Sequence, residues 1–272
     1  HLTNAFRQTQ LYRAMGWQIP AFAHIPLIHG PDGAKLSKRH GALGVEAYRD
    51  LGYLPEAMRN YLLRLGWGHG DDEIITTEQA VAWFDLGAVG RSASRFDFAK
   101  LDSLNAHYIT NSDDNRLVSL IAPLLEKTLG TPLSQDDNER LIKGMNGLKQ
   151  RAKNLNHLAE TALFYVKRPD SLSQKAGKIL DEQGRSTIAT LLPLLESLDA
   201  WSEEACESTV KAYADSHDMK LGNVAQPLRA ALTGTNVSPG IFEVMAILGR
   251  NETLLRLREI PTNIQADERA VN

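Results

Sequence analysis

Three absences limit what this 272-residue chain can be. Its only cysteine is Cys206, which excludes a disulfide framework and fits a reducing compartment. No stretch approaches the roughly 18 uninterrupted apolar residues that a membrane span needs, so no membrane partner is expected. The start, residues 1–4, has no methionine and none of the basic and apolar regions of a signal peptide. We therefore expect a cytoplasmic chain that begins partway through something longer.

The composition is that of a globular protein with segregated charge. Hydrophobic residues make up 43% of the sequence, which excludes wholesale disorder, and the length predicts about two domains. The net charge of −3 argues only weakly against nucleic acid. Residues 1–70 hold eight Lys and Arg against four Asp and Glu, and residues 141–190 hold nine against four. Two basic blocks fit either ordinary solvated faces or a polyanion held at two places.

The first hundred residues leave room for a small sheet among short helices. Residues 7–15 have an apolar side and precede Gly16, which predicts a helix. Residues 21–28 predict a strand interrupted by Pro26, and residues 30–33, Gly-Pro-Asp-Gly, are a strong turn signal.

From Pro55 onward the apolar residues recur with a helical period. Pro55 fits a first helical position, Gly66 fits the end, and the stripe between them consists of Ala57, Met58, Tyr61, Leu62 and Leu65. The pair Thr76 and Gln79 predicts a capping box ahead of the next helix. Five aromatic residues on apolar stripes are expected in the core: Trp67, Trp83, Phe84, Phe164 and Phe242.

The second half predicts helices almost throughout. Ser112 is the expected cap of a helix that ends at Gly130 and buries Leu117, Leu120, Ile121, Leu124 and Leu125. Residues 135–168 predict two helices broken near residues 144–147. After residue 170 we expect four or five short helices, with stops near Gly184, Gly222, Gly234 and Gly249. The end of the chain, from Asn263 on, is expected to fray.

The most unusual local sequence runs from residue 29 to residue 42. Glycine and proline turn formers precede a cluster of side chains that can be cationic, namely Lys35, Lys38, Arg39 and His40. A loop of this composition can place ammonium groups and backbone N–H donors around phosphate oxygens. It is not a Walker loop, because Ala34 separates Gly33 from Lys35. A solvated basic turn is compatible with the same residues.

The segment Lys35-Leu36-Ser37-Lys38-Arg39-His40-Gly41 resembles the KMSKS signature of class I aminoacyl-tRNA synthetases, in the form typical of glutamyl-tRNA synthetases. Other segments resemble that family in the same order: residues 1–12, 53–67, 226–234 and 238–240. The resemblance implies a mainly α chain. It would consist of the end of the catalytic domain (1–45), a small mixed α/β stem-contact region (46–112) and two helical anticodon-binding domains (113–172 and 173–272).

The resemblance also implies ATP-dependent attachment of glutamate to tRNA(Glu), with use of tRNA(Gln) left open. Lys38 would stabilise the charge that develops on the phosphates, and Lys35 would help to neutralise them. Ser37 and Gly33 would shape this ATP-binding loop, although Lys35 and Ser37 fit a purely structural role equally well. ATP with Mg²⁺ and L-glutamate would be substrates of the whole enzyme; no structural metal is expected, and the chain is expected to be a monomer.

Arg151 is the expected anticodon reader, because residues 148–155 resemble the family segment whose arginine has that role. Lys149 and Lys153 would bind tRNA beside it, and Arg229 fits either an RNA contact or an ion pair with a carboxylate. Splayed anticodon bases are read by arginine planes, base edges and stacking. The alternative for Arg151 is a plain surface cation.

An HIGH-like motif, the family's other signature, does not occur in the sequence. We therefore expect the carboxyl-terminal part of a glutamyl-tRNA synthetase, unable to make glutamyl-adenylate by itself. The rival interpretation is a free-standing RNA-binding module without ligase activity. A generic helical scaffold is the least favoured.

Overall fold

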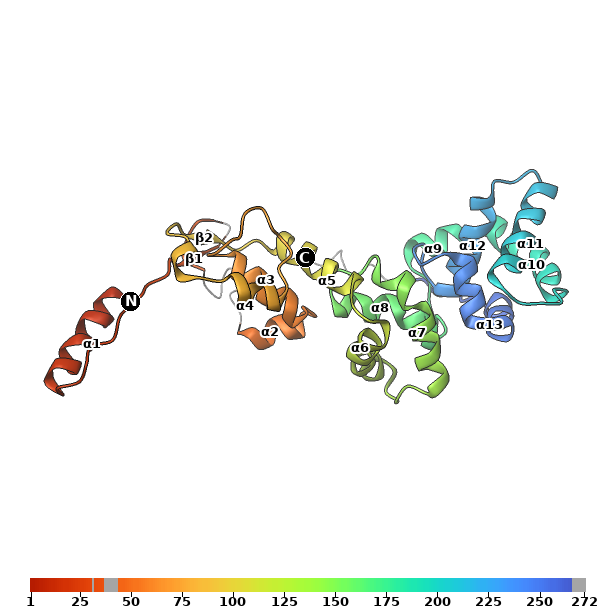
Figure 1. The fold of residues 1–272 in the computed structure, drawn as a ribbon. Coiled ribbons are helices and arrows are strands. Elements are labelled where there is room, and N and C mark those ends of the chain that lie inside the picture. Colours follow the sequence, from red (N-terminus) through yellow and green to blue (C-terminus); the bar gives the residue numbers. More distant parts are fainter. Residues whose placement is uncertain (31, 37–43, 266–272) are drawn as a thin grey trace. The chain divides into compact units, whose positions relative to one another are not determined.

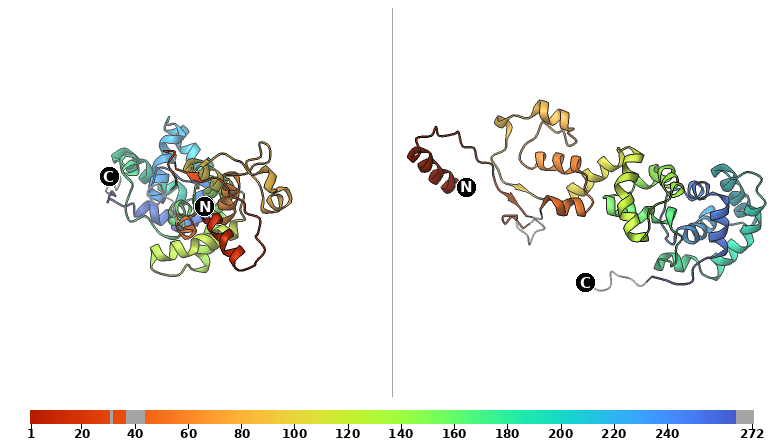
Figure 2. Two further views of the ribbon diagram at one scale, coloured as in Figure 1. Left: turned by 90° about the vertical axis from the view of Figure 1, so that its left-hand side faces the viewer. Right: turned by 90° about the horizontal axis from the view of Figure 1, so that it is seen from below.

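The computed structural model describes residues 1–30, 32–36 and 44–265, and Figures 1 and 2 show its ribbon from three directions. The chain divides into two compact units, residues 1–108 and residues 109–272, and each is described by itself. Helices predominate among the described residues, so the mainly α fold expected from the sequence is confirmed. None of the described helices has the length and apolar character that crossing a bilayer requires.

The first unit combines short helices with two short strands. Its elements are α1 (Leu2–Ala14), β1 (Ile28–His29), α2 (Val45–Asp50), α3 (Pro55–Arg64), α4 (Thr77–Trp83), the 3₁₀ helix η2 (Leu86–Ala88), β2 (Ser94–Arg95) and α5 (Phe98–Thr110), whose last residues belong to the second unit. The predicted first helix is present, but α1 buries none of its residues. Large apolar side chains on and after it are exposed, among them Leu2, Phe6, Leu11, Met15 and Trp17.

The sheet is smaller than the sequence predicts. β1 and β2 pair in parallel, with Ile28 opposite Ser94 and His29 opposite Arg95. The strand expected over residues 21–28 is wrong except at its last residue, since Pro26 has no N–H to donate to a ladder. The predicted turn is confirmed, because Gly33 N donates to Gly30 O at 3.0 Å.

An aromatic cluster forms the core of the first unit. It consists of Tyr48, Tyr53, Met58, Tyr61, Phe96 and Leu101, and Ile28 and Leu36 pack against it. Helix α3 begins at Pro55 as predicted, and its N-cap Leu54 has no side-chain acceptor. The buried Asn105 of α5 supplies one instead, since its Oδ1 accepts from Leu54 N at 2.8 Å. This bond ties the start of α3 to α5.

The capping box of α4 is confirmed, with Thr76 and Gln79 each bonded to the other's backbone N–H. Of the aromatic residues expected in the core, Trp67 is buried, whereas Phe84 is 47% exposed and Trp83, Phe164 and Phe242 are half-buried. Helix α4 has seven residues and buries none of them, so Trp83 at its end and Phe84 directly after it stay partly exposed. Leu62 of α3 is also exposed, at 48%.

The second unit is helical. Its elements are α6 (Asp114–Leu129), α7 (Gln135–Lys149), α8 (Leu155–Val166), α9 (Gln174–Ile179), α10 (Glu182–Glu196), α11 (Glu203–Ser216), α12 (Leu221–Thr233) and α13 (Ile241–Arg258). Helix α6 ends at Gly130 as predicted, with φ +74°, but Asp113 rather than Ser112 caps its start. Asp113 is the N-cap because its carboxylate accepts a hydrogen bond from Arg116 N at 2.9 Å. Leu117, Ile121 and Leu125 are buried as expected, whereas Leu120 is 37% exposed and Leu124 is half-buried.

The helix break expected near residues 144–147 is wrong. Helix α7 runs through both glycines, and the break lies at residues 150–154, where Asn154 caps α8. Gly144 allows close packing of the Tyr165 ring, because a Cβ at this position would lie 2.4 Å from that ring. A Cβ on Gly147 would lie 2.8 Å from Pro239.

Five helices follow residue 170 in the described part of the chain, within the predicted four or five, but only some of the glycines stop them. Gly234 ends α12 with φ +73°, and Gly249, with φ +78°, kinks α13. Gly184 and Gly222 lie instead in the first turns of α10 and α12. The fraying expected from Asn263 is wrong for residues 263–265, because Asn263 O and Gln265 N both bond to the backbone of Leu172 at 2.8 Å. Residues 266–272 lie outside the described part of the chain.

Candidate functional site

The turn that leads into the signature-like segment is held by short-range bonds. Gly33 adopts φ +78°, a left-handed conformation that glycine adopts without strain. Asp32 Oδ1 accepts from Ala34 N at 2.9 Å, and Gly30 N donates to Ala34 O at 2.9 Å. Lys35 follows with an exposed side chain. Gly33 is thus suited to shape the loop, and Lys35 is accessible to a ligand.

The rest of that loop lies outside the described residues, including the expected site residues Ser37 and Lys38 and the basic residues Arg39 and His40. The roles expected for Ser37 and Lys38 in binding ATP and in stabilising phosphate charge stay predictions. The roles expected for Gly33 and Lys35 stay predictions as well, although their positions are described.

In the second unit the structure brings Arg151 and Arg229 to one serine. Arg151 follows α7, and its Nη1 donates to the backbone O of Ser238 at 2.8 Å. Arg229 lies in α12, and its Nε donates to Ser238 Oγ at 2.9 Å. Ser238 is 6% exposed, and its hydroxyl donates in turn to Pro239 O at 2.8 Å. Two residues expected separately to contact RNA therefore form one cluster.

The cluster concentrates positive charge. Burial, and then the nearby charge of Arg151, lower the pKa of the Arg229 guanidinium. No carboxylate of the described residues forms an ion pair with either arginine. Arg229 was expected either to contact RNA or to pair with a carboxylate, and its bond in this structure is to a hydroxyl.

Other cations of the second basic block are engaged within the chain. Lys149 Nζ lies 2.7 Å from Asp114 Oδ1 and donates to Ser112 O at 3.0 Å, with 13% of its side chain exposed. Lys167 pairs with Asp170 at 2.8 Å, and Arg168 pairs with Glu252 through two bonds of 2.9 Å. Lys153 is exposed. Lys149 therefore ties the start of α6 to the end of α7, and its expected contact with tRNA stays a prediction.

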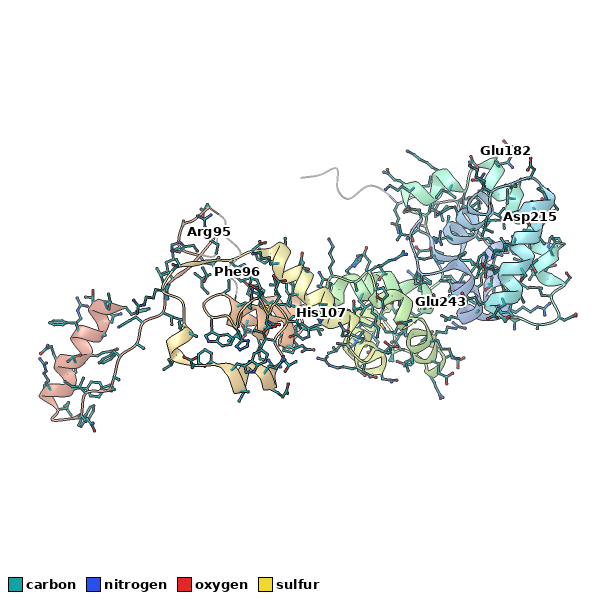
Figure 3. All side chains as sticks on the ribbon, turned by 45° about the horizontal axis from the view of Figure 1, so that its top comes forward. Arg95, Phe96, His107, Glu182, Asp215 and Glu243 are labelled. Carbon is teal, nitrogen blue, oxygen red and sulfur yellow. The ribbon has the colours of Figure 1, made fainter. Side chains whose placement is uncertain are left out.

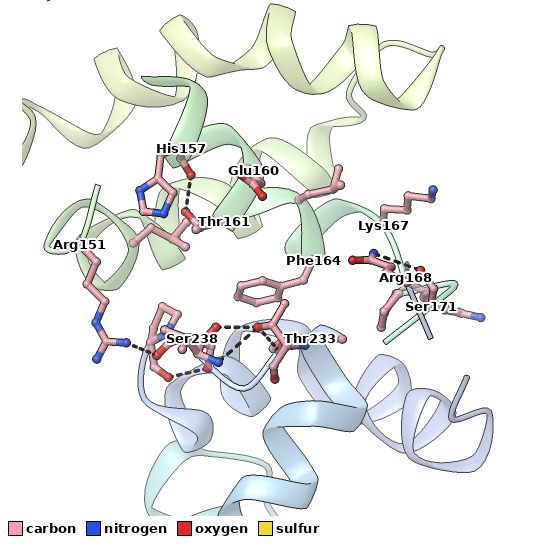
Figure 4. A pocket seen from close by; sticks show the side chains of 18 of the residues that line it. Arg151, His157, Glu160, Thr161, Phe164, Lys167, Arg168, Ser171, Thr233 and Ser238 are labelled. Atoms are coloured by element: carbon pink, nitrogen blue, oxygen red, sulfur yellow. Dashed lines mark hydrogen bonds between the residues drawn. The ribbon is translucent and has the colours of Figure 1, made fainter. Parts of the chain in front are cut away.

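A cavity of about 480 Å³ opens beside the arginine cluster. Figure 4 shows one wall built by α8, with His157, Thr161 and Phe164, and the facing wall built by residues 233–239. Arg151 lies at its edge and points to Ser238. The size is within the usual range for ligand pockets, roughly 300–1,000 Å³. A half-buried ring, an arginine plane and polar groups are what a splayed nucleobase requires.

Most residues that line this cavity had no predicted role there, and His157, Thr161 and Ser238 are among them. The buried Nδ1 of His157 has no hydrogen-bond partner among the described residues. Ser238 belongs to residues 238–240, a segment that carries the family resemblance, and this was the one sequence signal that could have identified it as a site residue. His157 and Thr161 gave none, because a helix face looks the same in sequence whether it lines a cavity or solvent.

Potential metal-ligating side chains do not cluster in the described part of the chain. Within residues 1–30, 32–36 and 44–265 no three His, Cys, Asp or Glu side chains gather in a way that could hold a metal ion. Cys206 is fully buried, and burial raises the pKa of its thiol to about 11. A thiol of this kind is a poor nucleophile.

Comparison with known proteins finds relatives over most of the chain. Residues 1–103 match the catalytic domain of class I tRNA synthetases (E and Q), and residues 116–261 match the anticodon binding domain. Glutamate–tRNA ligase 2 of Paramagnetospirillum magneticum is 60% identical over 261 residues, which are 95% of this chain and 55% of that protein. Glutamate–tRNA ligase 2 of Rhodospirillum rubrum is 59% identical, over 95% of this chain and 56% of that protein.

A solved structure shows the same fold. The crystal structure of a glutamate tRNA ligase from Elizabethkingia meningosepticum, in complex with its amino acid, superposes with a TM-score of 0.79 at 28% identity, over 95% of this chain and 54% of that one. The chain thus spans about half the length of the relatives it matches. It is a member of the glutamate–tRNA ligase family of class I tRNA synthetases, and residues 116–261 are its anticodon-binding domain.

Proposed function

We propose that this chain is the tRNA-binding portion of a ligase that attaches glutamate to tRNA(Glu) at the expense of ATP. The observation that carries the proposal is the convergence of Arg151 and Arg229 on Ser238 beside the cavity. Arg151 reads an anticodon base there, because its guanidinium can both stack on a base and donate to its edge. Arg229 supplies further charge to the RNA, whose phosphates it helps to neutralise.

The chain supplies only part of the reaction. Lys35 helps to neutralise the phosphates of ATP, which enters as its Mg²⁺ complex, and Lys38 stabilises the charge that develops on them. Gly33 and Ser37 shape the loop. The HIGH-like motif has no counterpart in this sequence, so the chain alone does not form glutamyl-adenylate. Exposed apolar side chains between residues 2 and 27 support this dependence on further parts of the enzyme, because an apolar surface of that kind is normally covered by protein.

Binding of the anticodon arm tests the RNA-reading role. The full chain should bind a tRNA(Glu) anticodon stem-loop more tightly than a loop with an exchanged anticodon. Arg151→Ala should weaken the cognate complex about tenfold and erase the preference, since contacts of this kind contribute about 1–3 kcal/mol. Lys127→Ala, on the exposed side of α6, is the matched control and should change neither value. Equal affinity for both loops, or an unaltered preference in Arg151→Ala, would contradict the proposal.

Two further assays test the ligase portion. ATP–pyrophosphate exchange with glutamate should be undetectable for the purified chain; clear exchange would refute its dependence on the rest of the enzyme. A parallel titration with the tRNA(Gln) anticodon arm measures whether the cavity separates the two tRNAs. The rival function, an RNA-binding module without a ligase role, requires that the chain fail to restore charging when it is joined to the amino-terminal half of a 60% identical relative.

A further inference from the structure

His29 lies between two cationic residues in the small sheet. Arg95 is its partner in the parallel pair of β1 and β2, and Lys35 is its partner in an antiparallel bridge. Gly30 N donates to Ala34 O and Leu36 N donates to Ile28 O, both at 2.9 Å, so the bonds flank the pair of His29 and Lys35. A pair flanked in this way is the type in which opposite side chains approach most closely.

Strand alternation decides where these three side chains point. Ile28 and Leu36, the neighbours of His29 and Lys35, pack against the aromatic core. Phe96 follows Arg95 and is 4% exposed in the same core (Figure 3 labels both). Since successive side chains of an extended strand point to opposite faces, His29, Lys35 and Arg95 share the face away from the core. Lys35 and Arg95 are exposed there, and His29 is half-buried.

Arg95 also reaches the turn that precedes the signature-like segment. A Cβ on Gly33 would lie 3.7 Å from Arg95 Nη2, so the guanidinium lies against the outside of the turn. Among the described residues, no carboxylate forms an ion pair with Lys35 or Arg95. Two cations on one sheet face, without a carboxylate between them, leave room for an external anion.

We propose that Lys35, His29 and Arg95 form a phosphate-binding row, in which Arg95 holds one phosphate with its planar pair of N–H groups and Lys35 holds an adjacent oxygen. The row rests on the proposed function, because Lys35 belongs to the signature-like segment, and it adds Arg95 and His29 to the groups that touch phosphate. A guanidinium suits this place, since its fork matches two phosphate oxygens and its charge is permanent. The ligand is a chain of phosphates, either the triphosphate of a nucleotide or an RNA backbone.

Calorimetric titration of the full chain with tripolyphosphate at low ionic strength tests the row. Arg95→Ala should weaken binding about tenfold, as expected for loss of a charge-assisted pair of hydrogen bonds, and Arg95→Lys should recover part of the loss. His29→Ala should cost about threefold, because it removes a single hydrogen bond. Arg91→Ala is the matched control: Arg91 is exposed and outside both strands, so its loss should leave the affinity unchanged.

A double variant shows whether Lys35 and Arg95 share one ligand. If they do, Lys35→Ala combined with Arg95→Ala should lose less affinity than the product of the two single losses. The same titrations with a single-stranded RNA oligonucleotide distinguish the sources: a loss confined to tripolyphosphate identifies a nucleotide triphosphate, and a loss confined to RNA identifies its backbone. Unchanged affinity of Arg95→Ala for both probes, or an equal loss in Arg91→Ala, would overturn the proposal.

The anticodon-arm titration, run on the same preparations, separates this proposal from the proposed function. Arg95 and Arg151 lie in different units, so Arg95→Ala should weaken phosphate binding without removing the anticodon preference, and Arg151→Ala should do the reverse. If Arg95→Ala weakens phosphate binding but Arg151→Ala leaves the anticodon preference unchanged, the phosphate row is supported and only the anticodon role is refuted. The reverse result would refute the row alone.

Discussion

The guanidinium of Arg256 is buried between the ends of two helices, and its removal should cost the second unit much of its stability. Arg256 Nη1 donates to Phe164 O in the last turn of α8 at 2.7 Å and to Leu232 O in the last turn of α12 at 2.8 Å. Its Nε donates to Glu252 Oε1 at 2.8 Å, and 2% of the side chain is exposed. Carbonyls in a last helical turn have no partner within the helix. Arg256 therefore joins the carboxyl ends of α8 and α12.

The size of the effect follows from what Arg256→Ala leaves behind. Breaking a buried ion pair costs about 3–5 kcal/mol, and a buried acceptor without a partner costs about 1–3 kcal/mol. These contributions overlap, and Arg168 still holds Glu252 through two bonds of 2.9 Å. We expect a loss of about 4 kcal/mol, a large share of the roughly 5–15 kcal/mol that stabilises a typical domain.

Urea unfolding followed by far-ultraviolet circular dichroism measures this loss. Arg258→Ala is the matched control on the same helix. Arg258 pairs with Glu196 at 2.6 Å but is 52% exposed, so its removal should cost about 1 kcal/mol or less. Arg256→Met, which keeps the volume but not the hydrogen bonds, should fall close to Arg256→Ala. The reasoning is refuted if Arg256→Ala and Arg258→Ala shift the unfolding midpoint equally.

Three further outcomes can be checked on the same chain. The hydrogen bonds from Arg168 hold the pKa of Glu252 at about 2, below its usual 4.5, so its carboxylate stabilises the fold above pH 4.5 and this is lost as the pH falls toward 2. Glu252→Gln should therefore lower the urea midpoint at pH 7 but change it little near pH 2. Gly144→Ala should cost about 2–3 kcal/mol, because its Cβ would meet the Tyr165 ring, whereas Gly222→Ala, with open space, should gain about 0.5 kcal/mol; similar effects would contradict this account. Iodoacetamide at pH 8 should modify Cys206 only as the chain unfolds, and rapid labelling of the folded protein would show that the thiol is accessible.

The sequence predicted the helix ends that depend on near neighbours. Thr76 with Gln79, and Gly130 after α6, act through bonds to residues three or four positions away, so their effect is visible locally. Gly144 looked like a break for the same local reason. Gly144 leaves space for the ring of Tyr165, which comes from another helix, and the sequence around residue 144 does not indicate that contact.

In the candidate site, too, the sequence identified single residues but not the contacts that bring them together. The family resemblance singled out Arg151 and Arg229, but their common acceptor, Ser238, emerges only when α12 and the loop after it are folded. Charge patterning likewise could not separate the exposed Lys153 from Lys149, of whose side chain only 13% is exposed. Sequence shows how many charges a segment carries, and tertiary structure decides which of them another molecule can reach.

The meeting of Arg151 and Arg229 at Ser238 links folding to binding. Two like charges lie close together there, and burial, and then the charge of Arg151, lower the pKa of Arg229. Like charges repel each other, so an anion bound between the two arginines would stabilise the native state beyond its own contacts. If RNA binds there as proposed, the second unit is less stable without RNA than its packing would allow, which is the usual exchange of stability for activity at a binding site.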